Sequence, residues 1–233
     1  MKLQRIHNNS DSWRNTPATY IGSRYAPVLH SVVIDTVAEF LYKKGLEVKK
    51  EHYLTDSQAL KAIGVINLGS LDDELDFTIA WRNSLDGTRS FTVVSGSVVS
   101  ICSNMNIWGD SYEFKRKHTG SAEEEIIVAL TRAIEDFNVV YKEHRAIRDL
   151  LKEQFIDHAT KSYILGELFL TNVLAANQIS IMKREIEAAS FDYKSKDTLW
   201  EIYNHATLSL KEGHPANWVE SHKKLSQTFK QWI

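Results

Sequence analysis

Cysteine is nearly absent from this sequence of 233 residues, which contains only Cys102. A single cysteine excludes a disulfide within the chain and a cysteine-rich zinc site, and it suits a reducing compartment. With three prolines in total, a proline-rich linker is excluded as well. No stretch approaches the roughly 20 apolar residues that a membrane helix requires, and the first residues lack the apolar run of a signal peptide. We therefore expect a protein of the cytoplasm, without a membrane partner.

An excess of charge of one sign is also lacking. The chain has 28 basic and 30 acidic residues, and this balance argues against bulk attraction to nucleic acid or to anionic membranes. A nucleic-acid site would have to be a local basic patch. Hydrophobic residues make up 43% of the sequence, enough for a substantial core. We expect a flexible, polar N-terminal arm over residues 1–26, with Trp13 and Tyr20 as docking points, and a single α+β domain over residues 27–233.

Short β-type runs separated by turn residues extend from 46 to 118, a pattern that predicts an antiparallel β-meander. In the clearest run, Phe77, Ile79 and Trp81 alternate with polar or small residues, so one face of that strand is apolar. Asp86-Gly87 then offers residues that tolerate positive φ and is interpreted as a structural turn. This region would form the β-rich core of the domain.

A helical region is expected from 119 to 233. Apolar residues between Ile127 and Leu151 recur at steps of three and four, which predicts one long helix. Capping boxes that begin at Ser121 and Thr198 mark the starts of two helices. The predicted fold class is therefore α+β, with an antiparallel β-meander in the N-terminal half packed on a long helix and a helical C-terminal half.

No stretch has the pattern of a catalytic signature or of a phosphate-binding glycine loop. The acidic residues between Asp72 and Asp76 are compatible with a hard cation, but they lack the EF-hand spacing, and a solvated turn is the favoured interpretation. The histidines lack metal-binding spacing. Cys102 lies in a predicted strand, where a core residue is more common than a nucleophile. We expect no metal and no cofactor.

A polar and basic group remains around the predicted hairpin. It consists of Arg82, Asn83, Arg89, Lys115, Arg116, Lys117 and His118. These residues are the candidates for nucleic-acid binding, and Trp108 and Tyr112 would add stacking surfaces for bases. The alternative, which we favour on the residues alone, is a structural turn followed by a solvated basic edge that discourages strand pairing.

Three motifs resemble a large family of uncharacterised phage and plasmid proteins, which is labelled a domain of unknown function. R-N-S-L-D-G-T (Arg82 to Thr88) resembles the family's N-S-H-D-G-S turn, I-C-S-N-M (Ile101 to Met105) its V-C-S-N strand end, and K-H-T-G (Lys117 to Gly120) its K-H-T segment. Leu85 stands where the family usually has histidine, so a proton-transfer or metal role of that histidine is not carried over. The resemblance implies a phage or mobile-element origin and action in the bacterial cytoplasm, without a general activity.

Two functions from different classes follow. The first is a phage accessory protein that binds nucleic acid in the host cytoplasm, of single-strand binding or annealing type, through the basic hairpin region. The second is a host-takeover or anti-defence protein that binds and inhibits a bacterial protein, with the six tryptophans as anchors. An enzyme ranks third, because it would need Asp86, Cys102 and His118 to converge. A homo-oligomer is compatible with each function.

Overall fold

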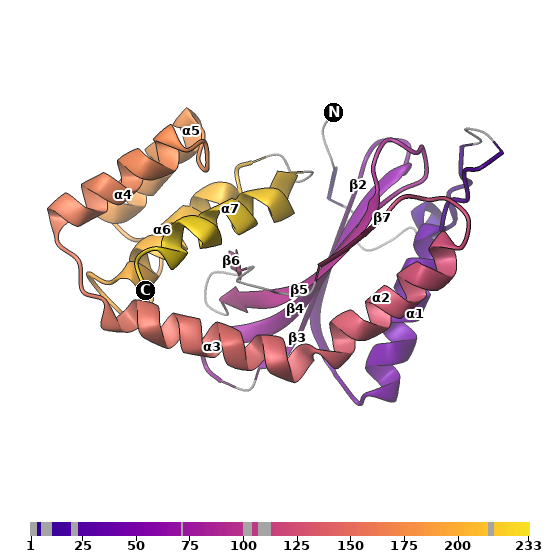
Figure 1. Ribbon diagram of the computed structural model, residues 1–233, viewed down its shortest axis with the longest axis horizontal. Coiled ribbons are helices and arrows are strands. Elements are labelled where there is room, and N and C mark those ends of the chain that lie inside the picture. Colours follow the sequence, from indigo (N-terminus) through magenta and orange to yellow (C-terminus); the bar gives the residue numbers. More distant parts are fainter. Residues whose placement is uncertain are drawn as a thin grey trace. The chain divides into compact units, whose positions relative to one another are not determined.

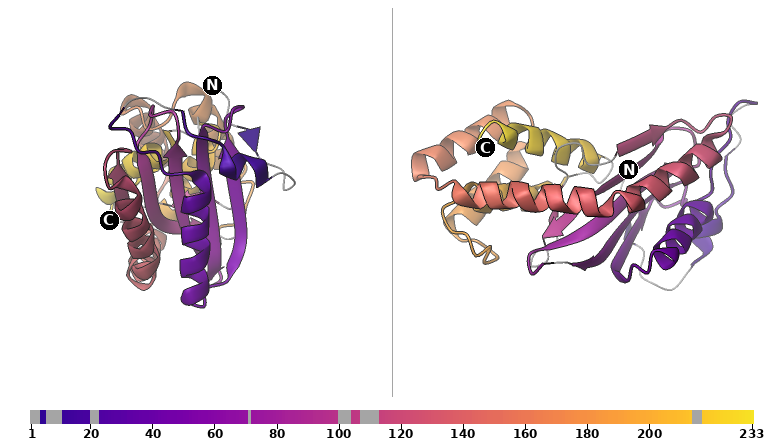
Figure 2. Two further views of the ribbon diagram at one scale, coloured as in Figure 1. Left: turned by 90° about the vertical axis from the view of Figure 1, so that its right-hand side faces the viewer. Right: turned by 60° about the horizontal axis from the view of Figure 1, so that its bottom comes forward.

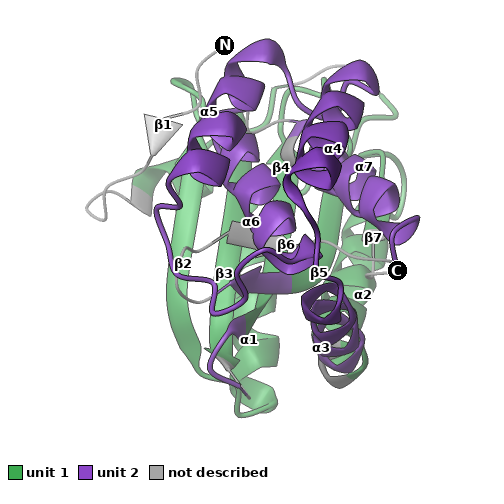
Figure 3. Ribbon diagram, turned by 90° about the vertical axis from the view of Figure 1, so that its left-hand side faces the viewer, with its two compact units in different colours: residues 1–71, 76–96, 111–140 green, residues 72–75, 97–110, 141–233 purple. Residues whose placement is uncertain are grey.

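The computed structural model describes residues 4–5, 11–19, 23–70, 72–99, 104–106, 113–213 and 217–233. The chain divides into two compact units, shown in Figure 3. We call residues 1–71, 76–96 and 111–140 the sheet unit, and residues 72–75, 97–110 and 141–233 the helical unit. The expectation of one domain over residues 27–233 stays a prediction.

The α+β fold class predicted from the sequence is confirmed (Figure 1). The strands are β1 (Gln4–Arg5), β2 (Val48–Thr55), β3 (Lys61–Ser70), β4 (Leu75–Ser84), β5 (Phe91–Val99), β6 (Asn104–Asn106) and β7 (Glu113–Arg116). They form one sheet in the order β1-β2-β3-β4-β5-β6, and β7 also pairs with β5. The helices are the 3-10 helix η1 (Asp11–Asn15), α1 (His30–Lys43), α2 (Ala122–Glu135), α3 (Phe137–Glu153), α4 (His158–Leu170), α5 (Ala176–Glu187), α6 (Leu199–Leu210) and α7 (Trp218–Lys230).

In the sheet unit, one apolar face of the sheet packs on α1 and α2 (Figures 1 and 2). The alternation predicted for β4 holds, because Phe77, Ile79 and Trp81 all belong to this core. Trp13 of η1 is also buried, with its ring centroid 5.4 Å from that of Tyr53. The expected docking of Trp13 is thus observed, whereas Tyr20 lies outside the described residues.

The single long helix predicted after the sheet is interrupted at Asp136, which separates α2 from α3. The Asp136 N–H still donates to the Arg132 carbonyl at 2.9 Å. Aspartate is unfavourable inside a helix because its short carboxylate competes for backbone donors. At the start of α2, the Ser121 hydroxyl donates to the Glu125 carboxylate and caps no backbone amide, so the predicted capping box is absent there.

The helical unit has its own apolar core, centred on α6. Trp200 and Tyr203 of this helix stack with their ring centroids 6.0 Å apart, and Phe229 of α7 meets Tyr203 edge-on at 5.1 Å. At the start of α6, one half of the predicted capping box is present, because the Thr198 hydroxyl accepts from the Glu201 N–H at 3.3 Å. The Glu201 carboxylate accepts from the Asp197 N–H at 2.9 Å. Among the described residues, no helix has the length and apolar character needed to cross a membrane.

Candidate functional site in the sheet unit

A polar hollow of about 350 Å³ lies in the sheet unit. Its lining consists of Tyr25, Gly87, Thr88, Arg89, Ser90, Lys117, His118 and Thr119. Three separate segments meet here: the residues before α1, the turn between β4 and β5, and the connection from β7 to α2. The first and third are joined by a bridge between Tyr25 and Thr119 and by a hydrogen bond from the Ala26 N–H to the His118 carbonyl, 2.9 Å long.

The turn beside the hollow is organised by the carboxylate of Asp86. One oxygen accepts from the hydroxyl and the N–H of Thr88, at 2.7 and 3.1 Å, and from the Ser84 hydroxyl at 2.5 Å. The other oxygen lies 2.9 Å from the Lys61 ammonium. Partial burial opposes ionisation, but the hydrogen bonds from Ser84, Lys61 and Thr88 hold the pKa of Asp86 well below its usual range. Gly87 follows with φ of 69°, a conformation that glycine adopts without strain.

His118 is the buried member of the lining. Its Nδ1 accepts from the Val28 N–H at 3.3 Å. Burial lowers the pKa of His118, so the ring is neutral at pH 7 and carries its proton on Nε2. The Tyr25 ring packs edge-on against the imidazole, and the Tyr25 hydroxyl donates to the Ser84 carbonyl at 3.2 Å. Tyr25 and His118 are thereby fixed in position.

A second buried histidine anchors the start of α1 to the sheet. The Asn83 side-chain amide donates to the Val28 carbonyl at 2.8 Å and lies 3.0 Å from His30 Nδ1. His30 Nε2 in turn contacts the Ala59 carbonyl at 3.1 Å. Burial lowers the pKa of His30 to about 4. Asn83 is therefore buried, and its side chain joins the sheet to the start of α1.

The predicted nucleic-acid-binding residues divide into two groups. Arg82 is buried and donates to the Thr92 hydroxyl at 3.3 Å. Arg116 forms a two-point ion pair with Glu125, at 2.6 and 3.1 Å, and also contacts Thr119. Asn83 and His118 are buried as well, and the Asn83 amide NH2 and His118 Nδ1 form hydrogen bonds within the unit. The other three candidates, Arg89, Lys115 and Lys117, are exposed.

Arg89 and Lys117 line the hollow together, whereas Lys115 lies on β7 outside its lining. Tyr25, Thr88, Ser90 and Thr119 were not predicted as site residues, although they also line the hollow. The R-N-S-L-D-G-T and K-H-T-G motifs contained Thr88 and Thr119, and Tyr25 begins the segment that resembles the family's entry helix, but nothing in the sequence pointed to these side chains as a site. Trp108, Tyr112 and Cys102 lie outside the described residues, so the predicted stacking surfaces and the cysteine are not placed.

A family model described as "Domain of unknown function (DUF932)" matches residues 18–231. The chain belongs to the DUF932 family. The match covers parts of both units and all segments of the hollow, and it begins after β1 and η1. Comparison of this DUF932 chain with curated proteins and with solved structures gives no match.

In this DUF932 chain, the acidic residues from Asp72 to Asp76, which were interpreted as a solvated turn, mostly form ion pairs. Within the helical unit, Asp72 accepts from Arg148 at 2.8 Å and lies 3.2 Å from Arg145, and Glu74 contacts Lys152 at 2.6 Å. The Asp72 carboxylate also caps the backbone N–H groups of residues 74 and 75, both at 2.9 Å. Burial opposes ionisation, but these amides and Arg148 lower the pKa of Asp72. Among the described residues, no group of three or more His, Cys, Asp or Glu side chains is arranged to hold a metal ion.

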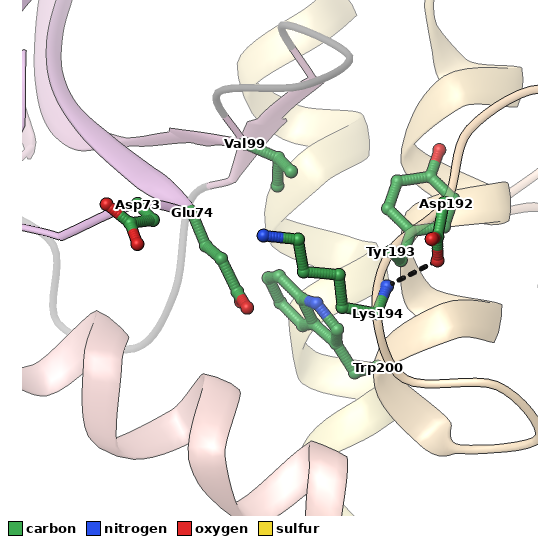
Figure 4. A pocket seen from close by; sticks show the side chains of 7 residues that line it. All are labelled: Asp73, Glu74, Val99, Asp192, Tyr193, Lys194 and Trp200. Carbon is green, nitrogen blue, oxygen red and sulfur yellow. Dashed lines mark hydrogen bonds between the residues drawn. The ribbon is translucent and has the colours of Figure 1, made fainter.

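A second hollow of the DUF932 chain lies in the helical unit and is much smaller, about 80 Å³ (Figure 4). Asp73, Glu74, Val99, Asp192, Tyr193, Lys194 and Trp200 line it. Lys194 has φ of 51°, and its N–H donates to the Asp192 carboxylate at 2.9 Å. The space suits a few water molecules. A third hollow, of about 390 Å³, also lies in the helical unit, and Glu212 is the one charged residue among the described residues of its lining. The hollow in the sheet unit, which has Arg89 and Lys117 in its lining, is therefore the better candidate for an anionic ligand.

Proposed function

We propose that this DUF932 protein is a phage-encoded accessory protein that binds single-stranded nucleic acid through the hollow of the sheet unit. The observation that supports the proposal is that two exposed cations, Arg89 and Lys117, come from different segments and line the same hollow. Among the described residues, neither forms an ion pair. Both charges are therefore available for phosphate groups.

The rest of the lining suits the same ligand. Hydroxyl groups of Ser90 and Thr119 supply hydrogen-bond donors for phosphate oxygens, whereas the Thr88 hydroxyl already donates to Asp86. The Tyr25 ring offers an aromatic surface, and base stacking on aromatic rings is worth about 1–3 kcal/mol per base. A site of this kind holds a strand by charge and stacking, with little dependence on its sequence.

The test is a titration of fluorescently labelled single- and double-stranded DNA at two salt concentrations. We expect micromolar binding that favours the single strand and weakens with salt, with a logarithmic slope of about −0.7 for each neutralised phosphate. The double variant Arg89→Ala/Lys117→Ala should lose at least tenfold in affinity. Lys50→Ala, at an exposed lysine of β2 outside the hollow, is the control and should bind normally. Absence of salt-dependent binding by the unaltered protein would refute the proposal.

A second candidate function is inhibition of a host protein by capture through the helical unit. Large apolar side chains of this unit support it, since Phe155 and Leu170 are each 79% exposed and Tyr163 is 64% exposed. Retention of one bacterial protein by the immobilised chain, lost in Leu170→Ser but kept in Arg89→Ala/Lys117→Ala, would favour this function over nucleic-acid binding.

A further inference from the structure

We infer that the hollow of the sheet unit takes one nucleotide, with its phosphate between Arg89 and Lys117 and its base or sugar against Tyr25, so that free nucleoside monophosphates bind there. The inference rests on the function proposed above, since both use this site, and it adds the size and kind of unit that the site recognises. It follows from the volume of the hollow, the local charge and the chemistry of His118.

The volume separates a nucleotide from smaller and larger ligands. Pockets for small organic molecules span about 300 to 1,000 Å³, and the hollow, at about 350 Å³, lies at the lower end of this range. A bare phosphate would leave most of that space empty. A tract of several nucleotides would exceed it, so further nucleotides of a strand would continue outside the hollow.

The local charge suits one phosphate. Asp86 is the acidic residue of the adjoining turn, and its carboxylate is turned toward Ser84, Thr88 and the Lys61 ammonium. It is therefore neutralised within the protein. Glu125 is likewise held by Arg116. The positive charges of Arg89 and Lys117 remain, and charge-assisted hydrogen bonds from such groups to phosphate are stronger than bonds between neutral groups.

His118 adds a polar group that the protein leaves without a partner. Its Nδ1 is used by the Val28 N–H, and its Nε2 is buried and makes no hydrogen bond among the described residues. The residue is 3% exposed and belongs to the lining. A buried donor without an acceptor is unfavourable, and native proteins usually satisfy such a group with water or a ligand. His118 belongs to the wall that a nucleotide in the hollow would contact, and because Nε2 has almost no exposed surface, a nucleotide oxygen reaches it only with a small shift of the imidazole or its neighbours.

The test is isothermal titration calorimetry of the full chain with adenosine 5′-monophosphate, adenosine and inorganic phosphate, combined with competition against a labelled single strand. We expect the monophosphate to bind at least tenfold more tightly than adenosine or phosphate and to displace the strand. Arg89→Ala/Lys117→Ala should abolish monophosphate binding, and Lys50→Ala should retain it, because Lys50 is an exposed cation away from the hollow.

The outcomes separate the two proposals. Strand binding that depends on Arg89 and Lys117, without binding of the monophosphate, would overturn the single-nucleotide site and leave the proposed function intact. Equal affinities for phosphate and monophosphate would also overturn it, because nothing beyond the phosphate would be recognised. Monophosphate binding without strand binding would support the nucleotide site and overturn the proposed function. Binding of neither ligand would overturn both.

Discussion

At the scale of single residues, Gly64 of β3 occupies a position with no room for a side chain. It is paired with Trp81 of β4, and a Cβ atom at Gly64 would overlap the Trp81 indole ring. Trp81 is buried in the core beneath α1 and α2 and cannot move away without disturbing that packing. Gly64→Ala should therefore reduce the free energy of unfolding by about 1–3 kcal/mol, measured by urea denaturation.

Gly69 provides the matched control for this variant, because it lies on the same strand and no heavy atom would come within 4 Å of its added Cβ. Gly69→Ala should change the free energy of unfolding by less than about 0.5 kcal/mol. If both variants lose the same stability, overlap with Trp81 is not the cause.

Residue types alone predicted the apolar face of β4. They did not predict which of the basic side chains are exposed and which are buried or paired. Phe77 and Ile79 face the core because alternation is a local property of a strand. Arg82 and Arg116 have the same residue type as Arg89, yet Arg82 is buried and Arg116 is held by Glu125. Whether a guanidinium is exposed and unpaired depends on partners that only the fold supplies, so the basic group could be found from the sequence while its exposed members could not.

At the scale of elements, the start of α6 depends on the Thr198 side chain. Its hydroxyl accepts from the Glu201 N–H and lies 2.7 Å from the Ser195 carbonyl, to which it donates. Thr198 is buried, and the helix that it caps is the centre of the helical core. Thr198→Ala should cost about 1 kcal/mol in the free energy of unfolding, measured by thermal or urea denaturation followed by circular dichroism.

Thr198→Ser is the control, because it removes a methyl group and keeps the capping oxygen. It should retain most of the stability that the alanine variant loses. If both variants lose the same stability, the missing methyl group is the cause and the capping hydrogen bond is not.

Helices and strands were predicted correctly where the hydrophobic pattern and the bounds of the backbone element coincide. The pattern from Ile127 to Leu151 continues without a break because α2 and α3 each bury one stripe of residues. The interruption at Asp136 is a property of the backbone, and a hydrophobic pattern records which residues are buried but not whether the helix between them is continuous. One helix was therefore predicted where two occur.

At the scale of the whole molecule, neutral buried histidines couple the stability of both units to pH. His30 and His118 lie in the sheet unit, and His205 and His222 lie in the helical unit. Burial lowers the pKa of each, to about 4 for His30 and about 3 for His222. In the unfolded chain, by contrast, histidine has a pKa of about 6.5.

Between these values the unfolded state binds protons that the folded state does not, so the free energy of unfolding should fall as the pH falls from about 6.5 toward 4. Each such histidine contributes at most about 1.4 kcal/mol per pH unit in this window.

Urea denaturation at pH 7, 6 and 5 measures the slope of the free energy of unfolding against pH. His30→Gln should make it shallower, whatever the variant does to stability at pH 7, because one proton-linked group is gone. His158→Gln, at an exposed position of α4, should leave the slope unchanged. A free energy of unfolding that is constant from pH 7 to pH 5 would show that the buried rings do not control the acid response.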